Sequence, residues 1–154
     1  MIGVAASGLA ACERHMDSAA VDALQARAAD VDTFVFASMT AVPANVPPDV
    51  NETVADPAKA RDVYSATLAL PLMPAGTYNC PADFGVTYQL TFSGQGATLM
   101  TAIVDPNGCQ QVQVTDGGLN AALLWSVNNS DYWGTLAADL GVKVNAIYPY
   151  FPTP

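Results

Sequence analysis

Three cysteines and a single histidine are the side chains of this sequence best suited to covalent or metal chemistry. A serine or cysteine nucleophile usually needs a neighbouring base, and His15 lies near the N-terminus in a segment rich in alanine and charge. We therefore expect His15 to be a solvated linker residue and expect no catalytic triad. Cys12, Cys80 and Cys109 contain no CxxC spacing, so we predict no metal site.

Paired carboxylates are a second source of chemistry, as in enzymes that hydrolyse glycosidic bonds. The candidate aspartates at expected turns or helix starts are Asp83, Asp105, Asp116 and Asp131. Aspartate is common at such places because its carboxylate accepts local backbone hydrogen bonds, and we favour this structural role. No GxGxxG or Walker-type loop occurs, so nucleotide binding has no support and we predict no cofactor and no catalytic residue.

Residues 1–11 resemble a truncated signal peptide, because they are small and apolar. Leu9-Ala10-Ala11-Cys12 has the order of a bacterial lipobox, although no Lys or Arg precedes it in the sequence. We therefore predict lipid attachment at Cys12 and an extracytoplasmic, membrane-anchored protein. Cys80 and Cys109 then remain as one pair, closing a loop of about 30 residues. A cytosolic protein could instead keep three free thiols.

The charge balance restricts the partners. Lys and Arg number 5 against 14 Asp and Glu, a formal net charge of −9. Phosphate backbones and anionic lipid surfaces both require clustered cations. We therefore predict no nucleic-acid partner, and contact with the membrane only through the lipid anchor.

The remaining chain is read as a tether over residues 12–30 and one domain over residues 31–154. The expected elements are a strand at 33–38, a proline-rich loop at 41–54, a helix beginning at Asp56 and ended by Pro71, strands at 86–92, 97–104 and 109–115, and a helix capped by Ser130 and ended by Gly141. Residues 119–127 fit either a fourth meander strand or an apolar loop, and residues 147–154 are expected to be extended. The predicted fold is therefore α+β, with a three- to four-stranded antiparallel meander, two helices on one face, and the order β-α-β-β-β-α.

The outward positions of the predicted meander carry hydrogen-bonding side chains without charge. They are Thr87, Gln89, Thr91, Gln111, Gln113 and Thr115. The simple interpretation is a solvated face. The alternative is an interaction face, because uncharged donors and acceptors cost less to desolvate than ions.

Three stretches carry a resemblance to other proteins: LPLMPAGTYNCPADFGVTYQLTF at 70–92, GCQQVQV at 108–114 and WGTLAADLGV at 133–142. From Asp56 onward the chain resembles uncharacterised secreted lipoproteins of actinobacteria and similar soil bacteria. The resemblance implies an exported, lipid-anchored domain with a Cys80–Cys109 disulfide, and it implies no activity.

These observations favour a non-catalytic, extracytoplasmic binding domain whose partner is an unknown envelope protein or ligand. A secreted-enzyme inhibitor is the alternative, with residues 71–84 as the expected inhibitory loop. A hydrolase of cell-envelope material that uses acidic residues is a weaker alternative.

Overall fold

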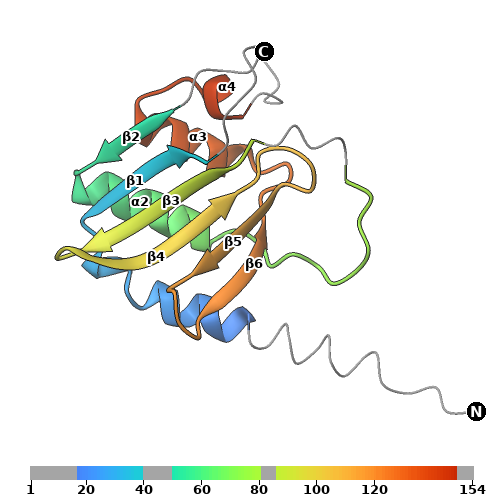
Figure 1. Cartoon of the computed structure of the whole chain (residues 1–154), viewed down its shortest axis with the longest axis horizontal. Helices are drawn as coiled ribbons and strands as arrows, with labels where there is room; N and C mark the ends of the chain where they lie inside the picture. The colour runs from blue at the N-terminus through green and yellow to red at the C-terminus, as the bar shows by residue number, and fades with distance from the viewer. Residues whose placement is uncertain (1–16, 40–49, 81–85, 149–154) are drawn as a thin grey trace, which may run out of the picture.

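A computed structural model of the chain describes residues 17–39, 50–80 and 86–148. These residues form an α+β fold around one six-stranded antiparallel sheet, with the strand order β2-β1-β3-β4-β5-β6 (Figure 1). The strands are β1 (Thr33–Ser38), β2 (Asn51–Val54), β3 (Tyr88–Gly94), β4 (Ala97–Val104), β5 (Gln111–Thr115) and β6 (Ala121–Trp125). The α+β class is confirmed, whereas the predicted sheet of three to four strands is too small.

Within the described parts of the chain, helices cover one face of this sheet and none lies on the other face (Figure 1). The helical elements are residues 17–25, η1 (Ala28–Asp30), α2 (Pro57–Leu68), α3 (Ser130–Leu140) and α4 (Val144–Ile147). Two principal helices on one face were predicted, and α4 was not. The molecule therefore has one helical layer, one sheet layer and a core between them.

Helix α2 forms where its N-terminal signals predict it. The Asp56 carboxylate accepts hydrogen bonds from the amides of Ala58 and Lys59, at 2.9 and 3.3 Å, and Pro57 occupies the first helical position. These contacts satisfy orphan donors of the first turn. The buried side chains of α2 are Ala60, Val63, Tyr64, Thr67 and Leu68, which is the predicted face.

Helix α3 has the predicted end and a different start. Asn129, and not Ser130, is the N-cap, because its side-chain oxygen accepts from the Tyr132 amide at 3.0 Å. Gly141 closes the helix in the left-handed conformation, with φ of 71°, as predicted. The sequence does not distinguish these two neighbouring candidates, because asparagine and serine are about equally good N-caps.

Aromatic contacts join the two layers. The ring of Tyr64 on α2 meets Phe92 on β3 edge-on, with 5.2 Å between centroids, and Phe92 lies 5.7 Å from Phe34 on β1. On α3, Trp133 stacks on Tyr148, with centroids 4.6 Å apart and planes 5° from parallel. The prediction of an extended tail is wrong for Ile147, which ends α4, whereas Tyr148 has extended backbone and is only 8% exposed. Residues 149–154 lie outside the described range.

Three strands, β1, β2 and β6, extend the three strands of the predicted meander to a sheet of six. β6 resolves the ambiguity over residues 119–127 in favour of a fourth meander strand, since Leu124 pairs with Val112 and is fully buried. β2 is an added edge strand that pairs with β1 in a segment predicted to be loop. Its sequence NETV is polar and mostly exposed, as edge strands often are, so it has no hydrophobic alternation to reveal it.

Residues 17–30, expected to belong to a tether, instead belong to the folded domain. Leu24 is fully buried, and its carbonyl accepts a hydrogen bond of 2.6 Å from the Tyr64 hydroxyl. Burial raises the pKa of Tyr64 to about 12, so this hydroxyl remains a donor at any physiological pH. The apolar stripe of this helix is thin, and its packing depends on α2. The first residues of the predicted tether, which include Cys12 and His15, lie outside the described residues.

A disulfide joins Cys80 to Cys109, with their Cα atoms 4.9 Å apart. The bond attaches the segment between α2 and β3 to the turn that precedes β5. The other end of that segment is held at the β6 edge, where Pro71 accepts from the Trp125 amide at 2.9 Å and Met73 donates to Leu123 at 2.9 Å. Figure 1 shows the intervening chain extending away from the sheet.

Candidate functional site

The sheet face opposite the helices, which we call the open face, is covered by no described helix (Figure 1). Strand pairing aligns its residues in rows across all six strands: Thr91, for example, pairs with Val35 on one side and with Thr101 on the other. The open-face residues are Asn51 and Thr53 on β2; Thr33, Val35 and Ala37 on β1; Gln89, Thr91 and Ser93 on β3; Thr101 and Ile103 on β4; Gln111, Gln113 and Thr115 on β5; and Ala121, Leu123 and Trp125 on β6.

Among the described residues, this surface carries no ionisable side chain on any of its six strands, in a chain of net charge −9. The five predicted residues that lie in strands β3 and β5 all belong to it, and Thr87 directly precedes β3. The sequence prediction missed the apolar members, of which Val35 is 40% exposed. Alternation within a single strand does not show which apolar residues share a face with Thr91 and Gln113, because that depends on the register between strands.

A shallow depression of about 410 Å³ lies over the β5–β6 end of the open face. Its lining residues are Asp17, Gln111, Gln113, Ala121, Ala122 and Leu123. Gln113 and Leu123 are cross-strand partners, so an amide and an aliphatic side chain meet at its floor. Asp17 supplies a carboxylate at the rim, from the N-terminal helix.

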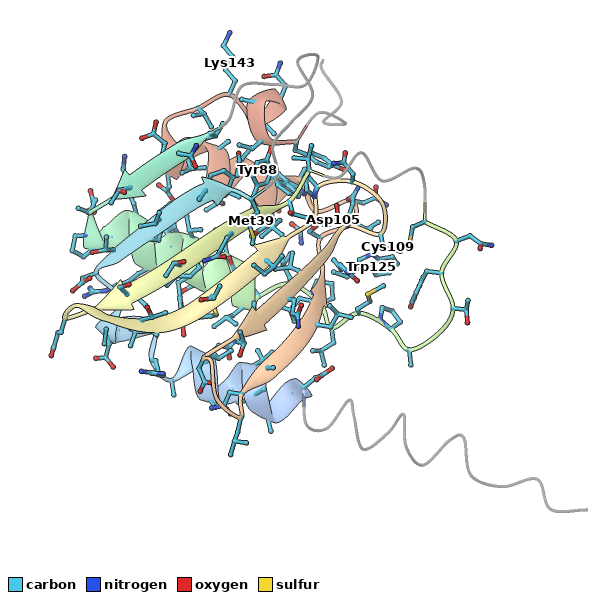
Figure 2. The ribbon with its side chains drawn as sticks, viewed as in Figure 1. Met39, Tyr88, Asp105, Cys109, Trp125 and Lys143 are labelled. Atoms are coloured by element: carbon cyan, nitrogen blue, oxygen red, sulfur yellow. A yellow bond between two sulfur atoms is a disulfide. The ribbon has the colours of Figure 1, made fainter. Side chains whose placement is uncertain are left out.

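An aromatic pair borders this end of the sheet. Trp125 is the cross-strand partner of Gln111, and its ring centroid is 5.8 Å from that of Tyr78. The Trp125 indole N–H donates to the Cys109 carbonyl at 2.8 Å, which fixes the ring beside the disulfide (Figure 2). Both aromatic rings are part-exposed, so they offer a rigid apolar surface next to the depression.

Three of the four predicted aspartates lie in the described residues, each at a separate turn or helix start. Asp105 accepts from the Asn107 amide at 2.9 Å and Asp116 accepts from the Gly118 amide at 2.8 Å, while Asp131 lies in the first turn of α3. These are the structural roles that the sequence favoured. Hydrogen bonds from the Asn120 side chain and the Gly118 amide also lower the pKa of Asp116. Asp83 lies outside the described residues.

A carboxylate pair that the sequence did not reveal lies on the outer side of the helices, where Asp62 of α2 meets Asp139 of α3. Burial and the neighbouring Asp62 charge raise the pKa of Asp139, and Lys59 opposes the shift. Both residues line a depression of about 590 Å³. Asp62 lies close enough to raise the pKa of Asp139 through its charge, whereas the two carboxyl groups of a glycosidase stand about 5 Å or more apart to hold a glycosidic bond between them. The pair therefore does not support the hydrolase alternative in its glycosidase form.

The raised pKa of Asp139 gives a pH-dependent prediction. Its unfolded pKa is near 3.8 and its folded pKa is higher, so the folded state loses stability as the pH rises from 3.8 through the folded value. Asp139→Asn should therefore stabilise the protein at pH 7 by roughly 0.5 kcal/mol, the scale of an exposed charge interaction. The gain should vanish below pH 3.8, as measured by thermal unfolding at both pH values.

Asp131→Asn is the matched control, because it removes a carboxylate from the other end of the same helix. A negative charge is favourable in the first turn, so this variant should be less stable than the wild type at pH 7. If Asp139→Asn also lowers stability at pH 7, the unfavourable interaction assigned to the Asp62–Asp139 pair is wrong.

The disulfide gives evidence about the compartment of the protein. Disulfides persist mainly in oxidising compartments such as the bacterial periplasm and the cell exterior, so the Cys80–Cys109 bond indicates an extracytoplasmic setting. Within the described residues, no helix has the length and apolar character needed to cross a membrane.

Comparison with known proteins gives no relative from which a function could be carried over. No protein-family model, curated protein or solved structure matches the chain.

Proposed function

We propose that this protein is an extracytoplasmic binding domain, tethered by a lipid on Cys12, that recognises a component of the cell envelope through its open face. The observation that carries the proposal is the six-strand surface without charge in a chain of net charge −9. A partner that covers this face desolvates threonine and glutamine side chains and not ions, which lowers the cost of binding.

The combination of apolar and aromatic residues on the open face supports the same proposal. Single exposed apolar residues are ordinary, but Val35 and Leu123 belong to one continuous face that also includes Trp125. Interfaces combine aromatic anchors with hydrogen-bonding groups and contain few charges at their centres. The anchor at Cys12 would hold this face at the envelope, and the resemblance to secreted lipoproteins favours that location.

Charge insertion tests the proposal. Gln89→Glu and Gln113→Glu are nearly isosteric, so each adds one negative charge with little change of shape. We expect the double variant to lose at least about tenfold in binding to isolated envelopes, because each carboxylate must be desolvated without a partner. Its free energy of unfolding should stay within about 0.5 kcal/mol of the wild type.

Ala58→Glu is the control for each single substitution, because it adds one negative charge on the exposed side of α2, where the helix N-terminus favours an acidic residue. Binding of this variant should equal that of the wild type. Normal envelope binding by the Gln89→Glu/Gln113→Glu protein would contradict the proposal, and a loss caused by Ala58→Glu would place the interaction on the helical layer.

A second candidate function, inhibition of a secreted enzyme, is favoured by the segment of residues 74–80. It is mostly exposed and is held at one end by the β6 edge and at the other by Cys80. A loop fixed at both ends binds an enzyme cleft with little loss of conformational entropy. Incubation with secreted proteases distinguishes this function, because an inhibitor would slow hydrolysis of a peptide substrate and remain uncut at Thr77 and its neighbours.

A further inference from the structure

The β5–β6 end of the open face combines a depression, amide side chains and an aromatic edge. We infer that this end, with Gln111, Gln113, Leu123, Trp125 and Tyr78, binds an electrically neutral polysaccharide. The inference rests on the proposed function, because it names the chemical class that the open face would recognise.

Charge argues for a neutral ligand. A polycation would be attracted to the protein's acidic surfaces in general, and a polyanion would be repelled by the net charge of −9. Neither would select a face to which the six strands present no ionisable side chain. The carboxylate of Asp17, which also lines the depression, comes from the N-terminal helix and not from the sheet. A neutral polymer gains nothing elsewhere on the molecule and meets the lowest desolvation cost here.

Hydrogen-bonding chemistry narrows the class to hydroxyl-rich polymers. A glutamine amide presents two N–H donors and a carbonyl acceptor, and a threonine hydroxyl both donates and accepts. Gln111, Gln113 and Thr115 follow one another on the same side of β5. Their groups can match sugar hydroxyls, which also donate and accept, whereas an apolar ligand would leave them unpaired.

The aromatic edge supplies the second element of sugar recognition. The C–H face of a pyranose ring is apolar and flat, and it stacks well on an indole or phenol ring. Trp125 is pinned by its bond to Cys109 and by contact with Tyr78, so its ring loses little conformational freedom on binding. Because Trp125 pairs with Gln111, one bound sugar ring could contact both the indole and the β5 amides.

A second copy of the chain is the competing occupant of this face. Two copies would bring together two molecules of net charge −9, and the long-range repulsion would oppose their association. The polar side chains also outnumber the apolar ones on the open face, unlike the interfaces of stable homodimers.

The test is affinity electrophoresis of the full chain in native gels that contain dextran, glycogen, laminarin or hydroxyethyl cellulose, with alginate as the anionic comparison. We expect at least one neutral polysaccharide to retard the wild type and alginate to leave it unretarded. Trp125→Ala should weaken binding about tenfold or more. Trp125→Phe, which keeps an aromatic face, should retain most of it, and thermal unfolding of both variants controls for folding.

Failure of all four neutral polysaccharides, or binding that Trp125→Ala leaves unchanged in a folded protein, would overturn the inference. Sedimentation of the wild type as a dimer that Gln113→Glu dissociates would overturn it in favour of a second copy. If no polysaccharide binds and the Gln89→Glu/Gln113→Glu protein still loses envelope binding, only the ligand class is wrong. Unchanged envelope binding by that protein would remove the proposed function as well.

Discussion

Replacing Cys80 and Cys109 together with alanine should destabilise the protein by about 3–4 kcal/mol. The bond spans a sequence separation of 29 residues, and closing a loop of that length removes this much conformational entropy from the unfolded chain in the chain-entropy model. In a chain of 154 residues, the midpoint of thermal unfolding should fall by about 10 °C. Calorimetry of the wild type and the double variant measures the difference.

A reductant provides the control for this prediction. Dithiothreitol should lower the midpoint of the wild type by a similar amount and leave that of the Cys80→Ala/Cys109→Ala protein unchanged. The segment of residues 74–80 would then be held only at its β6 end, through Pro71 and Met73, so it should become the first site of limited proteolysis. Equal midpoints for the oxidised wild type and the double variant would show that the bond contributes nothing to stability.

Gly94→Ala should cost about 3 kcal/mol, the upper part of the range for forcing extra volume into a packed site. A Cβ on Gly94 would overlap the backbone carbonyl of Asp30 and lie 2.9 Å from a methyl carbon of Leu99. The η1 turn crosses the β3–β4 hairpin at this position, so backbone must move to make room. We expect faster hydrogen exchange at Val31 and Asp32 as the turn separates from the hairpin, together with a lower unfolding midpoint.

Gly134→Ala is the matched control for the same substitution. Gly134 lies inside α3, and a Cβ there meets nothing within 4 Å. Because alanine is the better helix former, this variant should gain roughly 0.5–1 kcal/mol. Wild-type stability in the Gly94→Ala protein would mean that residues 28–30 do not pack on the hairpin as described.

Local signals explain which elements the sequence predicts. Helix α2 has its start encoded in Asp56 and Pro57, and a buried stripe at helical spacing follows within one segment. Strand β3 alternates in the same self-contained way, with Tyr88, Leu90 and Phe92 buried. Such elements follow from the sequence because their evidence lies within a window of about a dozen residues.

The remaining elements depend on partners far away in the chain. The helix over residues 17–25 has a stripe too thin to predict packing, and it is held through Leu24 by Tyr64, 40 residues later. Strand β2 forms because β1 offers it an edge. Asp62 and Asp139 lie on two different helices, α2 and α3. Strands β3 to β6 separate these helices in the sequence, so their relative placement depends on how the sheet forms.

In the candidate site, too, some residues follow from local sequence patterns and others only from the tertiary structure. The Thr and Gln rows on β3 and β5 were visible in the alternation of the sequence, and so was their lack of charge. The contributions of Val35, Leu123 and Trp125 required the sheet register, and the depression beside Gln113 required the placement of Asp17. The alternation within one strand therefore predicts that the surface is polar, but it does not predict how many strands the surface includes.

Site-specific photo-crosslinking in the native host tests the central claim most directly. A photoreactive phenylalanine analogue replaces Gln113 on the open face in one protein and Ala58 on the exposed side of α2 in another. The account predicts that irradiated cells yield a high-mass adduct from position 113 and none from position 58. Adducts of equal yield at both positions, or an adduct from position 58 alone, would contradict the assignment of the open face as the binding surface.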